Sequence, residues 1–310
     1  MRKSVKVLLI TAGGLVAVGA IVSSAALLLT HGKWEKLSYP SDTPYTERSE
    51  TFPAAQVERL DIEAVADDVE FIVTDGSEYR VTCSENQEHK YDISLSGGTL
   101  KVACKDISFS IPYGLDFNSR SNKLLIEVPS ECARADIESV SGDVKLPDGL
   151  SFGGALAVCT VSGEVRIGKV CVQGDAEVCS TSGEISMHGA SVSGRLAGAS
   201  VSGSFDLTDT VCSGDASIST TSGEVLASGF TCAMLDISSI SGDVRFSALD
   251  CAGAEIDTTS GEVVIDLTEP GEFRCDCKSV SGDVRLPDVS GNAASRSFKV
   301  DTVSGDIRIS

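Results

Sequence analysis

Ser141-Gly142-Asp143-Val144-Lys145-Leu146 opens a series of nine similar hexapeptides in a chain of 310 residues. Successive glycines of the series lie between 19 and 23 residues apart. A nearly fixed period of this size is typical of repeat architectures, in which each unit buries its apolar face only against its neighbours. The nine glycines are Gly142, Gly163, Gly183, Gly203, Gly223, Gly242, Gly261, Gly282 and Gly305.

Apolar and polar residues alternate on both sides of each glycine. Five positions before it most copies carry an apolar residue such as Ile137, and the position before that is mostly polar, as in Asp136. Val144 and Leu146 give the same alternation after the glycine. Period two predicts strands with one buried face, and glycine permits a tight corner between them, including positive φ. The serine before the glycine is expected to hydrogen-bond within its own turn.

Units of this length, without helical periodicity between them, predict an all-β fold. We expect a single-stranded parallel β-helix, or β-solenoid, with about 20 residues per coil. Parallel connections predict a right-handed coil. Regular repeats are expected over residues 131–310 and degenerate N-terminal coils over residues 54–130.

Two degenerate coils are recognisable before the regular array. Leu60-Asp61-Ile62, followed by Asp68-Val69-Glu70-Phe71, fits one coil with Asp67 in the glycine position. Tyr91-Asp92-Ile93, followed by Gly98-Thr99-Leu100-Lys101-Val102, fits a second. At the other end the last copy runs to Ser310, so its uncovered strand edge is a candidate for homo-oligomerisation through the C-terminal end of the solenoid.

Residues 1–33 are interpreted as a basic cytoplasmic start followed by a transmembrane anchor. Val7 to Thr30 contains no charged residue and is long enough to cross a bilayer as a helix. The basic residues before it place the N-terminus in the cytoplasm and the C-terminal domain outside the cell, in a single-pass membrane protein. A cleavable signal peptide is the alternative. Residues 34–53, which contain several prolines, are expected to form an extracytoplasmic linker.

An irregular segment at residues 105–122 interrupts the repeats. It contains Phe109, Tyr113 and Phe117 in a chain with only 5% aromatic residues. One interpretation is a binding loop presented by a rigid scaffold. The other is that these aromatic side chains cover the end or the side of the solenoid.

The chain has a net charge of −20 and a pI near 4.5, which argues against nucleic acid as a partner. An acidic residue follows most of the repeat glycines, and stacked carboxylates about 5 Å apart are a possible calcium site. The alternative is that basic side chains two positions later and solvent screen these charges. No cofactor is expected. The acidic residues concerned are Asp143, Glu164, Glu184, Glu224, Asp243, Glu262, Asp283 and Asp306.

Eleven cysteines are unusual in a chain of this kind. Cys159 and Cys179 occupy the same outward position in consecutive coils and are the first candidates for a disulfide, and Cys83 with Cys104 is the second candidate pair. Five others lie on the return segment and fit a ladder of small apolar thiols. These five are Cys132, Cys171, Cys212, Cys232 and Cys251.

The sequence contains no nucleophile elbow, no phosphate loop and no recognisable histidine partner for a nucleophile. The carboxylates are spread evenly along the repeats, as a repeat produces without any active site. We therefore expect no enzyme. A carbohydrate-active β-helix enzyme with an acidic cleft is the alternative, and a mechanical spacer is a third interpretation.

The array of Ser-Gly-Asp/Glu repeats, led by Leu60-Asp61-Ile62 and placed behind one apolar segment, resembles a bacterial adhesin-like domain family of unknown function. That family is common in Gram-positive envelope proteins, including ones linked to envelope-stress responses. The resemblance covers about Ala54 to Ser310 and implies a β-solenoid displayed outside the membrane, with no catalytic residue to transfer. The expected function is a tethered, non-enzymatic binding module for an envelope or surface component, either protein or polysaccharide.

Overall fold

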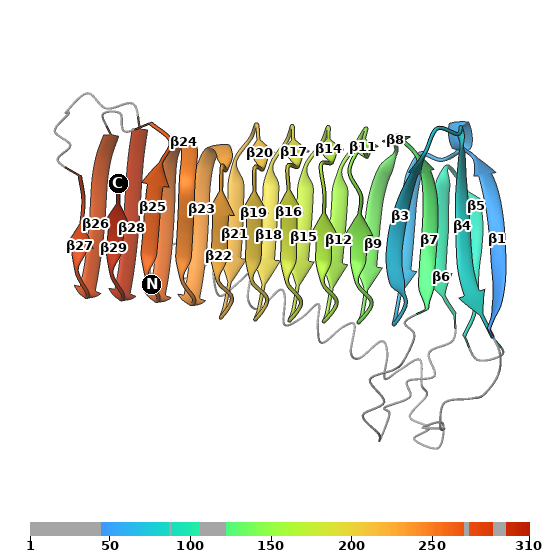
Figure 1. Ribbon diagram of the computed structural model, residues 1–310, viewed down its shortest axis with the longest axis horizontal. Coiled ribbons are helices and arrows are strands. Elements are labelled where there is room, and N and C mark those ends of the chain that lie inside the picture. Colours follow the sequence, from blue (N-terminus) through green and yellow to red (C-terminus); the bar gives the residue numbers. More distant parts are fainter. Residues whose placement is uncertain (1–44, 87–88, 106–121, 270–272, 288–295) are drawn as a thin grey trace, which may run out of the picture.

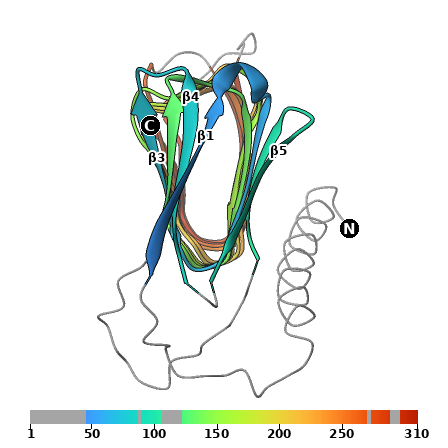
Figure 2. The ribbon, with the colours of Figure 1, turned by 90° about the vertical axis from the view of Figure 1, so that its right-hand side faces the viewer.

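The computed structural model describes residues 45–86, 89–105, 122–269, 273–287 and 296–310. They form an all-β solenoid in which two sheets face each other along the length of a rod (Figures 1 and 2). Within these residues the helical content is one short 3-10 turn, η2 (Ala54–Gln56). None of the helical structure described is long and apolar enough to span a membrane. The anchor expected in residues 1–33 lies outside the described ranges.

Sheet A contains the strands that follow each repeat glycine. From the N-terminal end of the rod its order is β1 (Thr46–Pro53), β4 (Glu78–Glu85), β7 (Lys123–Pro129), β3 (Asp68–Thr74), β10 (Val144–Leu146), β13 (Val165–Ile167), β16 (Ile185–His188), β19 (Phe205–Thr208), β22 (Val225–Ser228), β24 (Val244–Ser260), β25 (Val263–Leu267), β29 (Ile307–Ile309) and β27 (Val284–Arg285).

Sheet B contains the strands that precede each glycine. Its order is β5 (Tyr91–Ser96), β6 (Thr99–Cys104), β2 (Arg59–Ala64), β9 (Arg134–Ser139), β12 (Leu156–Thr160), β15 (Ala176–Ser180), β18 (Leu196–Ser200), β21 (Ala216–Thr220), β23 (Thr231–Ser241), the second half of β24, β28 (Arg296–Ser304) and β26 (Phe273–Ser281). A row of two-residue strands continues this sheet on the return segment: β8 (Glu131–Cys132), β11 (Ser151–Phe152), β14 (Cys171–Val172), β17 (Ser191–Val192) and β20 (Val211–Cys212).

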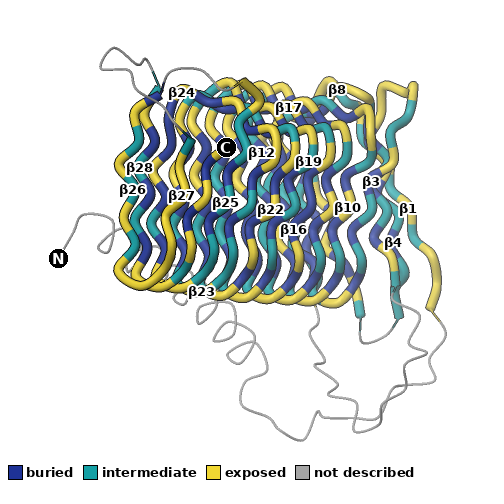
Figure 3. Tube along the Cα trace, turned by 60° about the vertical axis from the view of Figure 1, so that its left-hand side comes forward, coloured by how far each residue is buried: buried dark blue, intermediate teal, exposed yellow. Residues whose placement is uncertain are grey.

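Equivalent residues of neighbouring coils stack in register. Val144 pairs with Val165, and Val165 pairs with Ile185, in parallel strands. All three side chains are fully buried, so the inward positions form continuous aliphatic ladders. Figure 3 shows the resulting alternation of buried and exposed positions along each strand. The predicted parallel β-solenoid is confirmed for the regular repeats.

The corner glycines are required by the close approach of stacked backbones. A Cβ on Gly203 would lie 1.9 Å from the carbonyl oxygen of Gly183, and one on Gly183 would lie 1.8 Å from that of Gly163. Positive φ occurs at the corner only in Gly261 and Gly305 among the nine repeat glycines, all of which are described. Contact between coils, rather than a left-handed backbone, therefore selects glycine at most corners.

Hydroxyl side chains close the corner in a way that differs from the expectation. Thr160 Oγ1 and Ser180 Oγ accept the backbone N–H of the glycine three residues later, at 3.0 and 2.7 Å. The serine that precedes the glycine bonds to the previous coil instead, as Ser162 Oγ donates to the carbonyl of Val140 at 3.2 Å. The local turn contact is thus made by the Ser or Thr two residues before that serine.

The N-terminal end departs from the parallel pattern. Strands β5 and β6 form an antiparallel hairpin turned at Gly97 and Gly98, so the predicted second degenerate coil, with Tyr91 and Gly98 in one coil, is wrong. Strand β1 pairs antiparallel with β4 and occupies residues that the sequence assigned to the linker. The expected coil of β2 and β3 is present, between the strands β6 and β7 and the regular array.

The C-terminal end is not laid down in chain order. Strand β28 lies between β24 and β26, and β29 lies between β25 and β27. Stacking of glycine corners agrees, because a Cβ on Gly282 would meet the carbonyl oxygen of Gly305 at 2.2 Å, and one on Gly305 would meet that of Gly261 at 2.0 Å. The last coil in sequence is therefore covered on both sides, and the outermost coil is that of β26 and β27 (Figure 1). The expectation that the final repeat forms the open edge is wrong.

Candidate functional sites

Aspartate carboxylates at the corners accept hydrogen bonds from backbone N–H groups of a neighbouring coil. Asp143 Oδ1 accepts the N–H of Glu164 at 2.9 Å, and Asp243 Oδ1 accepts that of Glu262 at 2.8 Å. Asp306 Oδ1 accepts a further corner N–H in the same way, at 2.8 Å. Aspartate at this position thus satisfies a backbone donor that the bend would otherwise leave unpaired.

Basic side chains two positions later bridge the same carboxylates. Arg166 contacts Asp143 at 3.3 Å and also pairs with Glu164. Arg245 pairs with Asp243 at 2.6 Å and Glu262 at 3.0 Å, and these contacts raise its pKa, chiefly through Glu262. Among the described residues, no three His, Cys, Asp or Glu side chains are placed to hold a metal ion together. At the corners of Asp143, Glu164, Asp243 and Glu262 the carboxylates thus pair with basic neighbours, as in the alternative to calcium.

One disulfide joins consecutive coils in the described part of the chain. Cys159 and Cys179, the first pair expected from the sequence, are bonded with an S–S distance of 2.00 Å. Cys83 and Cys104, the second pair, do not form the expected disulfide with each other. Of the five cysteines expected to form a buried ladder on the return segment, Cys171 is exposed and the other four are buried.

A buried polar cluster closes the N-terminal end of the solenoid. Asp67, which holds the glycine position of its corner, has a side chain only 4% exposed. Its Oδ2 accepts hydrogen bonds from His89 Nε2 at 2.6 Å and from the Tyr91 hydroxyl at 2.5 Å. The other ring nitrogen of His89 lies 3.8 Å from Cys104 Sγ. The cluster ties β5 and β6 to the first corner.

The order Cys104, His89, Asp67 is that of a nucleophile, a base and an orienting acid. The hydrogen bond to Asp67, aided by that to Cys104, raises the pKa of His89 to about 10. At neutral pH the imidazole is therefore protonated and pairs with the Asp67 carboxylate. Burial, followed by the charge of Asp67, raises the pKa of Tyr91 as well. His89 and Asp67 thus form a largely buried ion pair at this end of the solenoid.

Sequence reasoning missed this cluster although one signal was available. Asp67 was visible as a charged residue in a column otherwise filled by glycine, and a buried carboxylate requires a partner. Its partner His89 is 22 residues away and is brought to it by an antiparallel hairpin that the repeat pattern does not predict.

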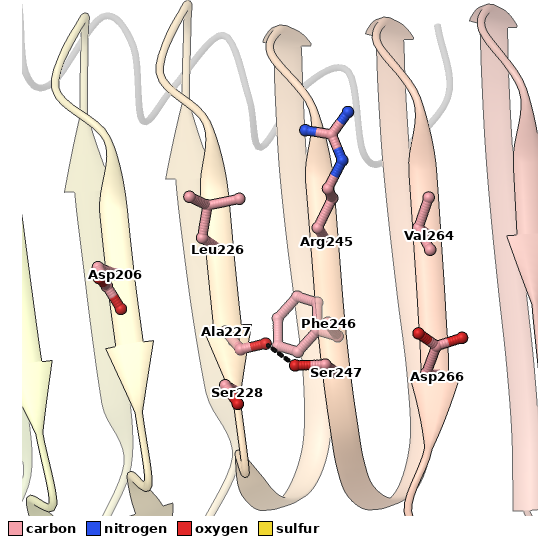
Figure 4. Close-up of a pocket in the computed structure, with 9 residues that line it drawn as sticks. All are labelled: Asp206, Leu226, Ala227, Ser228, Arg245, Phe246, Ser247, Val264 and Asp266. Carbon is pink, nitrogen blue, oxygen red and sulfur yellow. Dashed lines mark hydrogen bonds between the residues drawn. The ribbon is translucent and has the colours of Figure 1, made fainter.

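A shallow depression of about 340 Å³ lies on the outer face of sheet A, across β19, β22, β24 and β25 (Figure 4). In most copies the outward position three residues after the glycine is basic, as in Lys145, whereas here it holds Leu226 and Val264 on either side of Arg245. Ser247 Oγ donates to the carbonyl of Ala227 across its floor at 3.4 Å. The lining residues are Asp206, Leu226, Ala227, Ser228, Arg245, Phe246, Ser247, Val264 and Asp266.

The structure does not describe the predicted aromatic binding residues. Phe109, Tyr113 and Phe117 all lie in residues 106–121, outside the described ranges. Their role stays a prediction.

Comparison with known proteins finds one matching family. The family model described as Toastrack DUF4097 matches residues 57–310. No curated protein matches the chain significantly. Among solved structures, a candidate adhesin from Parabacteroides merdae is 10% identical with a TM-score of 0.42, covering 86% of this chain and 96% of its own.

Two further structures are similar at the same level. A candidate adhesin from Bacteroides fragilis is 14% identical with a TM-score of 0.39, and 87% of this chain and 99% of that chain are covered. A candidate lipid-binding protein from Parabacteroides distasonis is 16% identical with a TM-score of 0.37, with coverages of 84% and 96%.

Proposed function

Since the chain belongs to the Toastrack DUF4097 family, we propose that it is a non-enzymatic binding module, a β-solenoid held outside the cell by an N-terminal membrane helix. Its partner is a component of the envelope or of a neighbouring surface, either protein or polysaccharide. The tether is supported by the uncharged run from Val7 to Thr30 behind a basic start.

The observation that carries the proposal is the depression on sheet A. Five of the nine copies carry a basic residue at the outward position three after the glycine, whereas both neighbours of Arg245 in the stack carry an apolar side chain there. Leu226 and Val264 offer apolar contact, Arg245 offers a charged donor, and Ser228 and Ser247 offer hydroxyls. A mixture of apolar area and a few placed polar groups is what binding surfaces use.

The spacing of carboxylates supports binding rather than glycoside hydrolysis. Asp206 and Asp266 are the two carboxylates of the depression, and they come from β19 and β25. Three strand spacings separate those strands, about 14 Å. Catalytic carboxylate pairs of glycosidases lie roughly 5–10 Å apart, so this pair is too widely spaced.

A binding experiment tests the proposal directly. The full chain in detergent is co-sedimented with isolated cell envelope, and the double variant Leu226→Lys with Val264→Lys is compared with wild type. The matched control introduces the same two charges on the opposite sheet at Ala157 and Ala197, which are outward and half-buried. We expect affinity to fall about tenfold or more only in the first variant. Equal binding by both variants contradicts the proposal.

Two treatments of the envelope identify the kind of partner. Protease digestion abolishes binding if the partner is a protein, and periodate oxidation abolishes it if the partner is a polysaccharide. Tyr113→Ala with Phe117→Ala, measured in the same assay, tests the aromatic segment, for which we expect weaker binding without loss of folding. We further propose that binding contributes to envelope-stress signalling. This requires that the output of a stress-responsive reporter change when the Leu226→Lys, Val264→Lys double variant replaces wild type.

A further inference from the structure

The rod ends at the coil of β26 and β27 with one side of both strands unpaired in the described part of the chain. Strand β26 is hydrogen-bonded to β28, and β27 to β29, and no further described strand follows (Figures 1 and 3). A strand edge of this kind exposes a row of backbone donors and acceptors that another strand can pair with.

The aliphatic ladders of the core are also exposed at this end. Val284 is 39% exposed and Leu286 is 40% exposed, whereas the stacked equivalents in the adjacent coil, Ile307 and Ile309, are 0% and 2% exposed. Val280 is 82% exposed, the highest value among the large apolar residues described. Its equivalent in the adjacent coil, Val303, is 52% exposed, and Val161 in the regular array is half-buried. The terminal coil therefore has the surface of an inner coil that lacks one neighbour.

The N-terminal end of the rod is built differently. There the antiparallel strands β1, β4 and β5 are added to the two sheets, and the side chains of Tyr79 in β4 and Tyr91 in β5 are almost completely buried. Bulky side chains thus close the core at one end. The described residues of the other end contain no equivalent closure.

Charges along β26 determine which partner fits. Its outward side chains alternate in sign, in the order Arg274, Asp276, Lys278. If a second β26 pairs antiparallel about Cys277, Asp276 of each copy lies opposite Lys278 of the other. The same register keeps outward residues opposite outward residues, and it places the aliphatic stem of Arg274 against Val280 of the second copy.

We propose that the open C-terminal end binds a second copy of this chain, with β26 of the two copies antiparallel about Cys277. A two-fold axis perpendicular to the sheets reverses both the rod and its strands, so that each sheet continues into the same sheet of the second copy. The terminal core positions Val284 and Leu286 of both copies then gain the neighbouring coil that they lack. This inference is independent of the ligand surface on sheet A.

Sedimentation velocity of the full chain in detergent tests the proposal through charge reversal. Wild type is expected to be a dimer at micromolar concentration. Asp276→Lys places two lysines opposite each other at two symmetric sites and is expected to weaken the dimer about tenfold or more, as is Lys278→Asp. The exchanged pair, Asp276→Lys with Lys278→Asp, restores opposite charges and is expected to restore the dimer.

Glu177→Lys is the matched control, because Glu177 has the same outward position in the inner strand β15 and is exposed. It is expected to leave the dimer unchanged. Hydrogen exchange of the β26 amides adds a second measurement, with protection expected in wild type and loss of protection in Asp276→Lys. A protein that stays monomeric at 100 micromolar overturns the proposal, whether or not its β26 amides are protected. If they are protected in that monomer, other residues of the same chain cover the edge of β26. A dimer that is insensitive to both single reversals overturns it as well.

Discussion

Gly203→Ala tests the idea that contact between stacked backbones selects glycine at the corners. The added Cβ lies 1.9 Å from the carbonyl oxygen of Gly183 and 2.8 Å from its carbon. Ordinary contact begins near 3.4 Å, so the two coils must separate locally by about 1.5 Å. Hydrogen bonds on both sides resist this movement, including Ser202 N–H to Thr181 O at 2.9 Å. Overpacking and one or two lost hydrogen bonds together predict a loss of about 3–5 kcal/mol.

Gly153→Ala is the matched control for this substitution. Its Cβ would meet nothing nearer than the carbonyl oxygen of Cys132 at 3.6 Å, and its φ is not positive. The free energy of unfolding is measured for both variants by urea denaturation followed by circular dichroism. We expect Gly153→Ala to stay within about 1 kcal/mol of wild type. The explanation of the corner glycines fails if Gly203→Ala lies within 1 kcal/mol of Gly153→Ala.

Three further predictions follow from the cluster at Asp67, the disulfide and the corner carboxylates. The pKa of His89 is raised to about 10 in the folded protein, from about 6.5 in the unfolded chain. Protonated His89 therefore stabilises the folded protein fully below about pH 6.5, and this stabilisation is lost as the pH rises through 10. Between pH 7 and pH 10.5 the urea midpoint is expected to fall by less in His89→Gln than in wild type. Replacing Cys159 and Cys179 by serine opens a loop of sequence separation 20 and is expected to lower the free energy of unfolding by about 3 kcal/mol, while non-reducing peptide mapping finds the two cysteines linked only in wild type. Asp243→Ala removes the acceptor of a backbone N–H and is expected to lower the free energy of unfolding by about 1–2 kcal/mol. Glu224→Ala, at an exposed residue, is expected to lower it by less than about 0.5 kcal/mol in the same denaturation assay. Equal losses would contradict the role of Asp243 as a backbone acceptor.

The regular repeats could be predicted from the sequence because one short pattern determines the strands, the corner and the register of each coil. Alternation around Gly163 gives two strands, the glycine gives the corner, and the fixed period gives the register in which Val144 stacks on Val165. The match to the Toastrack DUF4097 family confirms the resemblance that rests on these repeats. The pairing of Cys159 with Cys179 followed from the same register.

The two ends could not be predicted, because there the spatial order of coils differs from their order in the chain. Nothing in the repeat around Ser304 distinguishes a final coil from one placed between β24 and β26. The spatial order of the coils depends on which arrangement buries more surface. A periodic sequence pattern fits the chain order and the intercalated order equally well. The hairpin of Tyr91 and Leu100 shows the same limit, since alternating residues fit parallel and antiparallel strands equally well.

The depression on sheet A was missed for a related reason. A search for repeats averages over copies, and Leu226 and Val264 appear in such an average as small deviations at an outward position. The stacking of β22, β24 and β25 brings these two deviations onto the same surface beside Arg245.

The intercalated β28 and β29 have a consequence for how the protein matures. A polypeptide that emerges from its N-terminus can add each coil of the regular array to the one before it, as soon as that coil is complete. Strands β26 and β27 are synthesised earlier than the segment that separates them from β24 and β25, so they must wait, or dock temporarily and then be displaced. Synthesis that halts before residue 296 leaves them without their native neighbour. An interrupted product therefore presents β26 and β27 without the backbone partners that the complete chain gives them.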